Sequence, residues 1–158
     1  MCPARRCAKY DNMTEYRVRS AEERREDILA RAAELGIDDA YISRLVDTFY
    51  TRVRAHPLLG PVFNEAITDW EPHLTTMKDF WASVALNAGR YSGKPVPAHA
   101  RHRTIAPWHF DIWLGLFEQT LRDTAPTPGA APYFMERANR IAQSLQFAMF
   151  GFPGLERK

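Results

Sequence analysis

Apolar residues recur at helical spacing in five stretches of the chain, and no stretch alternates as a half-buried strand would. The widest apolar face falls between residues 38 and 56 and consists of Tyr41, Ile42, Leu45, Val46, Phe49, Tyr50 and Val53. A face of this width predicts a helix that is buried along one side. The other periodic stretches lie at about 20–35, 69–88, 107–121 and 133–150. The pattern therefore predicts an all-α domain of five or six helices.

Residues that start or stop helices separate these stretches. Ser20 and Glu23 form a capping box before the first stretch, and Gly36 offers its stop. Pro57 ends the second stretch, because the residue before a proline avoids the helical region. The other boundaries are expected at Asp38 or Asp39, Thr68 or Asp69, Gly89 and Pro107. The expected connections are a corner at Gly60-Pro61, a loop with at most one turn of helix over 90–106, and a loop over 123–132.

Composition narrows the class of protein. The chain has 158 residues, an ordinary length for one domain, with 46 % hydrophobic and 25 % charged residues. A net charge of +2 gives no reason to expect a nucleic acid or membrane partner. No apolar run reaches the ~18 residues of a membrane span, and the N-terminus lacks the apolar core of a secretory signal. Cys2 and Cys7 are expected to be free thiols, and the protein is expected to be cytoplasmic.

Three polar side chains stand on apolar helical faces. His73 shares its face with Met77 and Trp81. A buried imidazole costs free energy unless it is hydrogen-bonded, so His73 either bonds a backbone carbonyl in the core or points as a donor into a cavity. Tyr50 and Trp113 raise the same question, since a buried hydroxyl or indole N–H also needs an acceptor. Three such donors favour an external acceptor, such as a bound oxygen species.

His99 lies in a turn-rich segment directly before an aromatic helix. A flat, apolar, iron-bearing cofactor needs one nitrogen ligand on one side and donors on the other, between aromatic walls. His99 together with His102 and His109 is also compatible with a zinc site, although no Cys, Asp or Glu lies between them. His56 and His109 are otherwise expected at the surface or in packing. The chain contains no nucleophile elbow, phosphate loop, zinc-protease or dinucleotide motif.

Four blocks of the sequence resemble one family. They are FYTRVRAHPLLGPVF (49–63), DWEPHLTTMKDFW (69–81), GRYSGKPVPAH (89–99) and HFDIWLGLF (109–117). In order and spacing they resemble the truncated haemoglobins of group III, over roughly residues 38–150. The resemblance implies a shortened globin fold, a two-over-two helical sandwich around haem b. The expected organisation is an N-terminal extension over 1–37, partly disordered with a short helix, a globin domain over 38–152 and a tail over 153–158.

The resemblance also implies roles for individual residues. His99 matches the iron ligand, and Tyr50, His73 and Trp113 match the polar positions on the opposite, distal side. The further cofactor-binding residues are Phe63, Met77, Trp81, Arg90, Tyr91 and Phe110, with Arg90 and Tyr91 near the haem edge and its propionates. His102 follows His99 by three residues, so it could compete for the iron.

The expected function is reversible binding of O2, NO, CO or peroxide at a five-coordinate iron. Several donors on the distal side slow ligand release, which favours scavenging, sensing or redox chemistry over bulk oxygen transport. Peroxidase-like or nitric-oxide-consuming activity would then need a separate reductase, because the sequence holds no flavin or nicotinamide module. Two alternatives stay open at this point. They are a cofactor-free helical interaction module and a zinc hydrolase that uses His99, His102 and His109.

Overall fold

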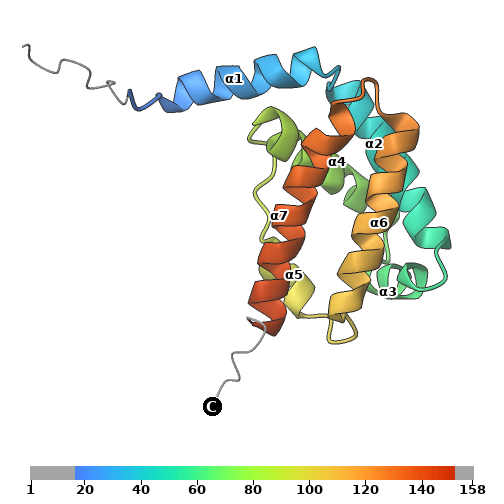
Figure 1. Ribbon diagram of the computed structural model, residues 1–158. Helices are drawn as coiled ribbons and strands as arrows, with labels where there is room; N and C mark the ends of the chain where they lie inside the picture. The colour runs from blue at the N-terminus through green and yellow to red at the C-terminus, as the bar shows by residue number, and fades with distance from the viewer. Residues whose placement is uncertain (1–16, 152–158) are drawn as a thin grey trace, which may run out of the picture.

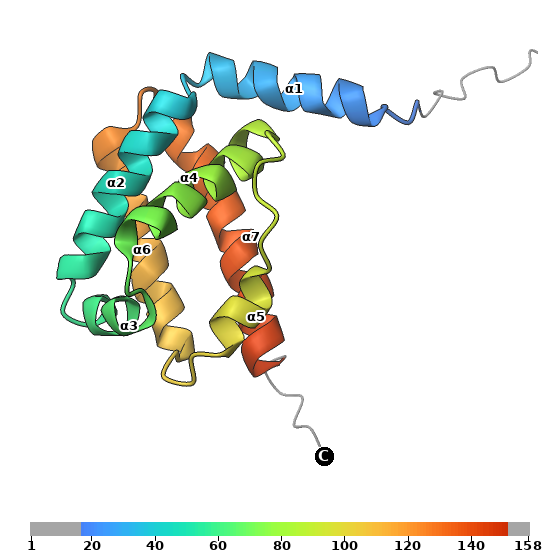
Figure 2. The same cartoon turned by 180° about the vertical axis from the view of Figure 1, so that it is seen from behind.

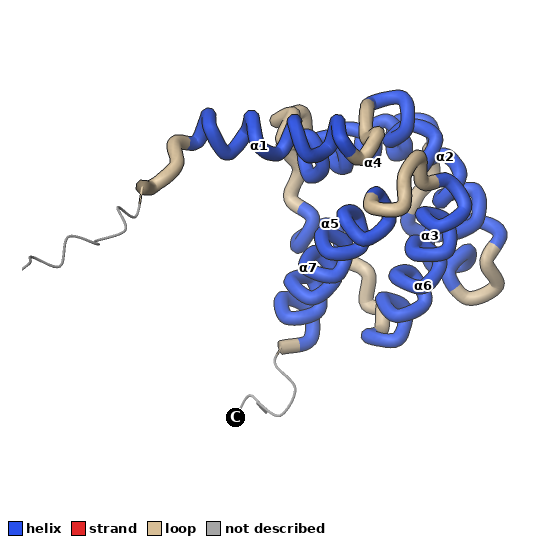
Figure 3. The backbone as a smooth tube through the Cα atoms, turned by 45° about the horizontal axis from the view of Figure 1, so that its top comes forward, coloured by secondary structure: helices blue, strands red, loops and turns tan. Residues whose placement is uncertain are grey.

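The regular structure of the protein is entirely helical in a computed structural model that describes residues 17–151 (Figure 3). Its helices are α1 (Ala21–Glu34), α2 (Asp39–Ala55), α3 (Leu59–Ala66), α4 (Trp70–Leu86), α5 (Pro95–Ala100), α6 (Pro107–Thr124) and α7 (Ala130–Phe150). The predicted all-α class is confirmed. The predicted count of five or six helices is wrong for the described range, because α3 and α5 are both short helices where a corner and a loop were expected.

The four long helices α2, α4, α6 and α7 form two layers. Figure 1 shows α6 beside α7 in one layer, with α2 and α4 crossing behind them in the other, and Figure 2 shows α2 and α4 in front. α2 packs against both α4 and α6, and α6 packs along α7. This is the predicted two-over-two sandwich. Stacked aromatic rings join the layers: Trp81 of α4 lies 4.9 Å from Phe117 of α6, centroid to centroid, at an interplanar angle of 21°.

Most helix boundaries lie where the sequence places them. The Ser20–Glu23 capping box is formed, and the Asp38 carboxylate accepts the backbone N–H of Tyr41 at 2.7 Å. Pro107 is the first residue of α6. The predicted stop at Gly89 is wrong by a few residues, since α4 ends at Leu86 with Asn87 in the left-handed region at φ 53°. Asparagine is one of the few non-glycine residues that tolerate that region.

The Gly60-Pro61 segment is helical rather than a corner. Both residues lie in the first turn of α3, where proline costs no helical hydrogen bond. A Cβ on Gly60 would lie 2.6 Å from the carbonyl oxygen of Arg54, so only glycine lets α3 start this close to the end of α2. The contact turns one side of α3 toward the interior, and Val62 and Phe63 then line the cavity described below.

The first helix lies outside this sandwich. α1 extends away from the other helices in Figures 1 and 2, and Ala32 is its one buried residue. This matches the position that its narrow apolar stripe predicts. Residues 1–16 and 152–158, including Cys2 and Cys7, lie outside the described residues, and so does the disorder expected near the N-terminus. Within residues 17–151, no helix combines the length and the apolar character that a membrane span requires.

Candidate functional site

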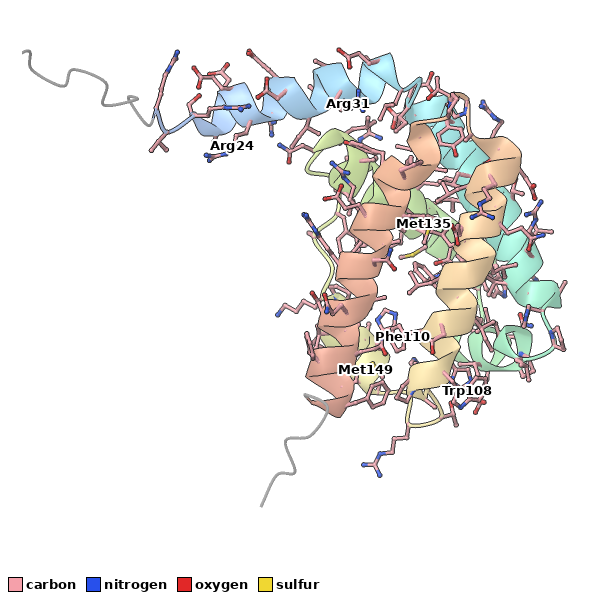
Figure 4. All side chains as sticks on the ribbon, in the orientation of Figure 1. Arg24, Arg31, Trp108, Phe110, Met135 and Met149 are labelled. Carbon is pink, nitrogen blue, oxygen red and sulfur yellow. The ribbon has the colours of Figure 1, made fainter. Side chains whose placement is uncertain are left out.

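An apolar cavity of about 350 Å³ lies between the two layers, and residues of α3 and α5 also line it. Every predicted site residue except Arg90 lines it, namely Tyr50, Phe63, His73, Met77, Trp81, Tyr91, His99, Phe110 and Trp113. Figure 4 shows Phe110 directed into the space between α6 and α7. Residues from α2, α3, α4, α5, α6 and α7 thus converge on one volume, although they are up to 95 residues apart, from Tyr50 to Leu145.

His99 enters the cavity wall from α5 with its ring orientation fixed by one hydrogen bond. Its Nδ1 lies 2.6 Å from the carbonyl oxygen of Pro95. A carbonyl only accepts, so Nδ1 carries the proton and donates it, and Nε2 keeps a free lone pair. Histidines that bind metals generally use this arrangement, in which one ring nitrogen is tied to a carbonyl and the other binds the ion.

His73 lies on α4, in the same cavity wall as Tyr50. Its Nε2 is buried and has no hydrogen-bond partner anywhere in residues 17–151. Burial lowers the pKa of His73, with a smaller lowering contribution from the nearby His99, so the His73 ring is neutral near pH 7. The sequence left two interpretations of His73 open, a hydrogen bond to a backbone carbonyl or a donor that points into a cavity. The structure shows no hydrogen bond from Nε2 to a backbone carbonyl. The imidazole of His73 lines the cavity, and its Nε2 atom has no protein partner within the described residues.

Tyr50 and Trp113 complete the polar side of the cavity. Burial raises the pKa of the Tyr50 hydroxyl, which therefore stays protonated and remains a donor. The Trp113 ring stacks on Phe117 with centroids 5.4 Å apart and meets Phe49 edge-on. Within the described part of the chain, neither the hydroxyl nor the indole N–H has a hydrogen-bond partner. The side chains of Tyr50, His73 and Trp113 therefore lack a hydrogen-bond acceptor within the described residues.

Trp70 supports two of these donors and was missed by the sequence reasoning. Its ring meets His73 edge-on at 5.6 Å and lies 6.0 Å from Tyr50. The guanidinium of Arg54 lies 4.6 Å from the centroid of the Trp70 ring. The available signal was the spacing, because Trp70 precedes His73 by three residues and so lies on the same helical face.

Arg90 is placed away from the cavity. Its guanidinium forms two bonds to the Asp39 carboxylate, at 2.7 and 2.9 Å, and this pairing lowers the pKa of Asp39. Arg101 and His102 line the cavity instead, so the expected competition of His102 for a metal stays open. The sequence analysis did not identify Arg101. The available signal was its position two residues after His99.

His109 is also part of the wall, although it was expected at the surface or in packing. It is buried, lines the cavity and accepts the backbone N–H of Ala106 through Nδ1 at 2.8 Å. No three His, Cys, Asp or Glu side chains in the described range are placed to hold a metal ion together. The zinc alternative built on His99, His102 and His109 therefore lacks the geometry that it needs.

The donor set fits a flat apolar ring that carries a metal. It offers one imidazole with a free lone pair, an orphaned imidazole nitrogen and two further donors in the same cavity, and an otherwise apolar lining. A small polar substrate would leave most of this lining unused. A dry core would leave the His73 Nε2 atom unsatisfied, at a cost of about 1–3 kcal/mol.

The chain is similar to proteins of known family. No protein-family model matches it. It is 32 % identical over 122 residues to the group 3 truncated hemoglobin ctb of Campylobacter jejuni, a match that covers 75 % of this chain and 95 % of that protein. A shorter match, 52 % identical over 33 residues, is to the group 2 truncated hemoglobin YjbI of Bacillus subtilis, covering 21 % of this chain and 25 % of that protein. The crystal structure of group III truncated hemoglobin from Campylobacter jejuni aligns with a TM-score of 0.69 and 32 % identity, over 75 % of this chain and 96 % of that one.

Proposed function

This chain belongs to the group III truncated haemoglobins, and on that premise we propose that its cavity binds haem b and that His99 would hold the iron. Haem binding follows from membership of the globin family. The b type suits a sequence whose only cysteines are Cys2 and Cys7, because covalent attachment of haem needs a C-x-x-C-H motif. The observation that carries the proposal is the bond from His99 Nδ1 to Pro95, which leaves Nε2 free to bind a metal.

The opposite side of the cavity is proposed to bind a diatomic ligand. When bound, ferrous haem supplies an open coordination position for O2, NO or CO. Tyr50, His73 and Trp113 then provide hydrogen-bond donors for that ligand, with Tyr50 protonated and His73 neutral for the reasons given above. A hydrogen bond to a charged acceptor contributes about 1.5–3 kcal/mol. Two of them slow ligand release by roughly 10²–10⁴-fold.

Slow release suits scavenging, sensing or redox chemistry better than bulk oxygen transport. The same donors favour peroxidase-like or nitric-oxide-consuming turnover, because both reactions build negative charge on the ligand that faces them. In this proposal the electrons for repeated turnover come from a separate reductase.

The haem propionates need basic partners at the cavity mouth. Arg101 lines the cavity, is exposed and has no ion pair within residues 17–151. Arg90 is already bound to Asp39 by two hydrogen bonds, which weighs against the propionate contact expected from the sequence. We therefore assign the propionate contact to Arg101 in the first place, and the contact of Arg90 stays a prediction.

The test is haem uptake by the wild-type protein and by His99→Ala. Wild-type protein purified from iron-replete cells, or reconstituted with hemin, is expected to show an intense Soret band. His99→Ala is expected to lose haem on gel filtration and to regain it when imidazole is added, because imidazole replaces the missing ligand. His102→Ala is the matched control and is expected to keep its haem. A colourless, folded wild-type protein would refute the proposal and favour the cofactor-free interaction module.

A further inference from the structure

Positive charge is concentrated in one segment of an otherwise balanced chain. The net charge of the whole chain is only +2, yet no acidic residue occurs between Asp79 and Asp111. Four basic residues fall in that interval, namely Arg90, Lys94, Arg101 and Arg103. Arg90 is neutralised by Asp39. The other three are exposed and have no ion-pair partner among the residues that the structure describes.

These three residues lie at the end of the molecule that carries α5. Lys94 precedes α5, Arg101 ends it, and Arg103 lies in the loop that leads to α6. α5 packs against α7, and the last turns of α7, from Ile141 to Phe150, contain no charged residue. The last turns of α7, next to α5, therefore provide no acidic counterpart to this positive charge.

Apolar side chains are exposed at the same end. Val96 on α5 is 38 % exposed, Trp108 at the start of α6 is 48 % exposed, and Phe150 at the end of α7 is 43 % exposed. Figure 4 shows Trp108 at the N-terminal end of α6 and Met149 at the C-terminal end of α7, both at this end of the molecule. Exposed tryptophan and arginine residues are enriched in protein–protein interfaces.

Trp108 is also coupled to the cavity. Its ring stacks on the ring of His109, with centroids 3.8 Å apart at an angle of 25°. His109 is buried and lines the cavity. The exposed ring of Trp108 and the buried ring of His109 therefore connect the surface to the cavity wall by direct contact.

We propose that this end, formed by Lys94, Val96, Arg103, Trp108 and Phe150, is the docking surface for an acidic electron-donor protein that carries a reduced iron–sulfur or flavin centre. The inference rests on the proposed function, because it assigns a docking surface to the separate reductase that this function requires. One electron leaves the donor, which is oxidised by one electron, and reduces ferric haem iron to the ferrous state, without bond formation or proton transfer. A basic surface selects an acidic partner, and small, electrostatically steered contacts are typical of redox pairs.

The test measures reduction of the ferric protein by a reduced acidic [2Fe–2S] ferredoxin in stopped flow. The variant K94E/R103E reverses two surface charges and leaves Arg101 intact, because Arg101 lines the cavity. The matched control R24E/R25E makes the same charge change on α1, where Figure 4 labels Arg24 far from α5. At an ionic strength of about 0.01 M, K94E/R103E is expected to slow reduction by about tenfold or more. At about 1 M salt the difference is expected to vanish, because the charges are then screened.

Binding is measured separately from electron transfer. Oxidised ferredoxin is titrated into the haem-loaded, CO-treated, ¹⁵N-labelled protein, and the indole signal of Trp108 is expected to shift in the wild type and not in K94E/R103E. Equal effects of both double variants, or an unmoved Trp108 signal, would overturn the inference. Tighter binding of RNA or of anionic lipid vesicles than of ferredoxin would overturn it too.

The two proposals fail in distinguishable ways. If K94E/R103E keeps the Soret band and is reduced normally by dithionite, a normal rate with ferredoxin refutes the docking surface alone. If the wild-type protein takes up no haem, the proposed function fails first.

Discussion

The two walls of the cavity are built very differently. The distal wall, from α2, α4 and α6, consists of side chains that also form the core, since Trp81 stacks on Phe117 and Phe117 meets Phe49 edge-on. The wall that carries His99 is α5, a helix of six residues with no buried residue of its own. A single hydrogen bond to Pro95 orients the His99 ring.

This difference separates stability from ligand binding. A substitution in the distal wall disturbs both, because its aromatic rings hold the two helical layers together as well as the donors. A substitution in α5 is expected to leave the core untouched, because none of the residues of this helix is buried. The distal wall is therefore expected to keep its geometry without a cofactor, whereas α5 is the element that the cofactor orders most.

The largest expected effect comes from Trp81→Ala. The substitution removes a fully buried ring that stacks on Phe117, so it should lower the free energy of unfolding by about 3–5 kcal/mol. The matched change in the other wall is Val96→Ala, which is expected to stay within about 0.5 kcal/mol of wild type because Val96 is partly exposed. Urea unfolding of the cofactor-free proteins measures both. Equal losses would abolish the contrast between the walls.

Tyr50→Phe tests whether the Tyr50 hydroxyl donates a hydrogen bond to the bound ligand. Loss of one hydrogen bond to a charged acceptor should speed O2 dissociation roughly 10- to 150-fold, measured by stopped flow on the ferrous protein. Tyr133→Phe removes a hydroxyl that donates to the carbonyl of Ala85, at 2.7 Å, and lies outside the cavity lining. This control is expected to keep the wild-type off-rate. An unchanged rate in Tyr50→Phe would mean that the hydroxyl does not face the ligand.

A smaller effect on the stability of the cofactor-free protein is expected from a change in pH. The pKa of His73 is lowered in the folded protein below its usual value of 6.5, so the unfolded chain binds the extra proton more readily. The stability of the cofactor-free protein should therefore decline as the pH falls below about 6.5, down to the folded pKa. His73→Phe should flatten this part of the profile, measured by thermal unfolding between pH 5 and pH 8. A profile that keeps its slope in His73→Phe would assign the effect to other groups.

The smallest effects concern the two arginines. Arg90→Ala is expected to leave haem affinity unchanged, because the side chain is bound to Asp39 and not directed into the cavity. Arg101→Ala is expected to weaken haem retention modestly, as judged by the rate of haem transfer to an apoglobin. If Arg90→Ala weakened haem retention more than Arg101→Ala, the propionate contact would belong to Arg90, as the sequence analysis expected.

Helical periodicity, capping residues and prolines sufficed to predict the fold class and most helix boundaries. These signals are local, because each depends on residues within one or two turns of the same helix. Residues such as Tyr50, His73 and His99 were also identifiable, because a polar group on an apolar face or next to a turn is conspicuous in the sequence. The resemblance of the four blocks then linked them to one cofactor.

Other features depended on contacts between segments far apart in the chain. The close approach of Gly60 to Arg54 made α3 a helix where a corner was expected, and the ion pair with Asp39 drew Arg90 away from the cavity. The support of His73 by Trp70 and the stacking of Trp108 on His109 were likewise visible only in three dimensions. Sequence alone determined which residues form helices and which faces are apolar, because these properties depend on neighbours along the chain. Which polar groups meet at the cavity depends on how the faces pack together, and that was decided by the tertiary structure.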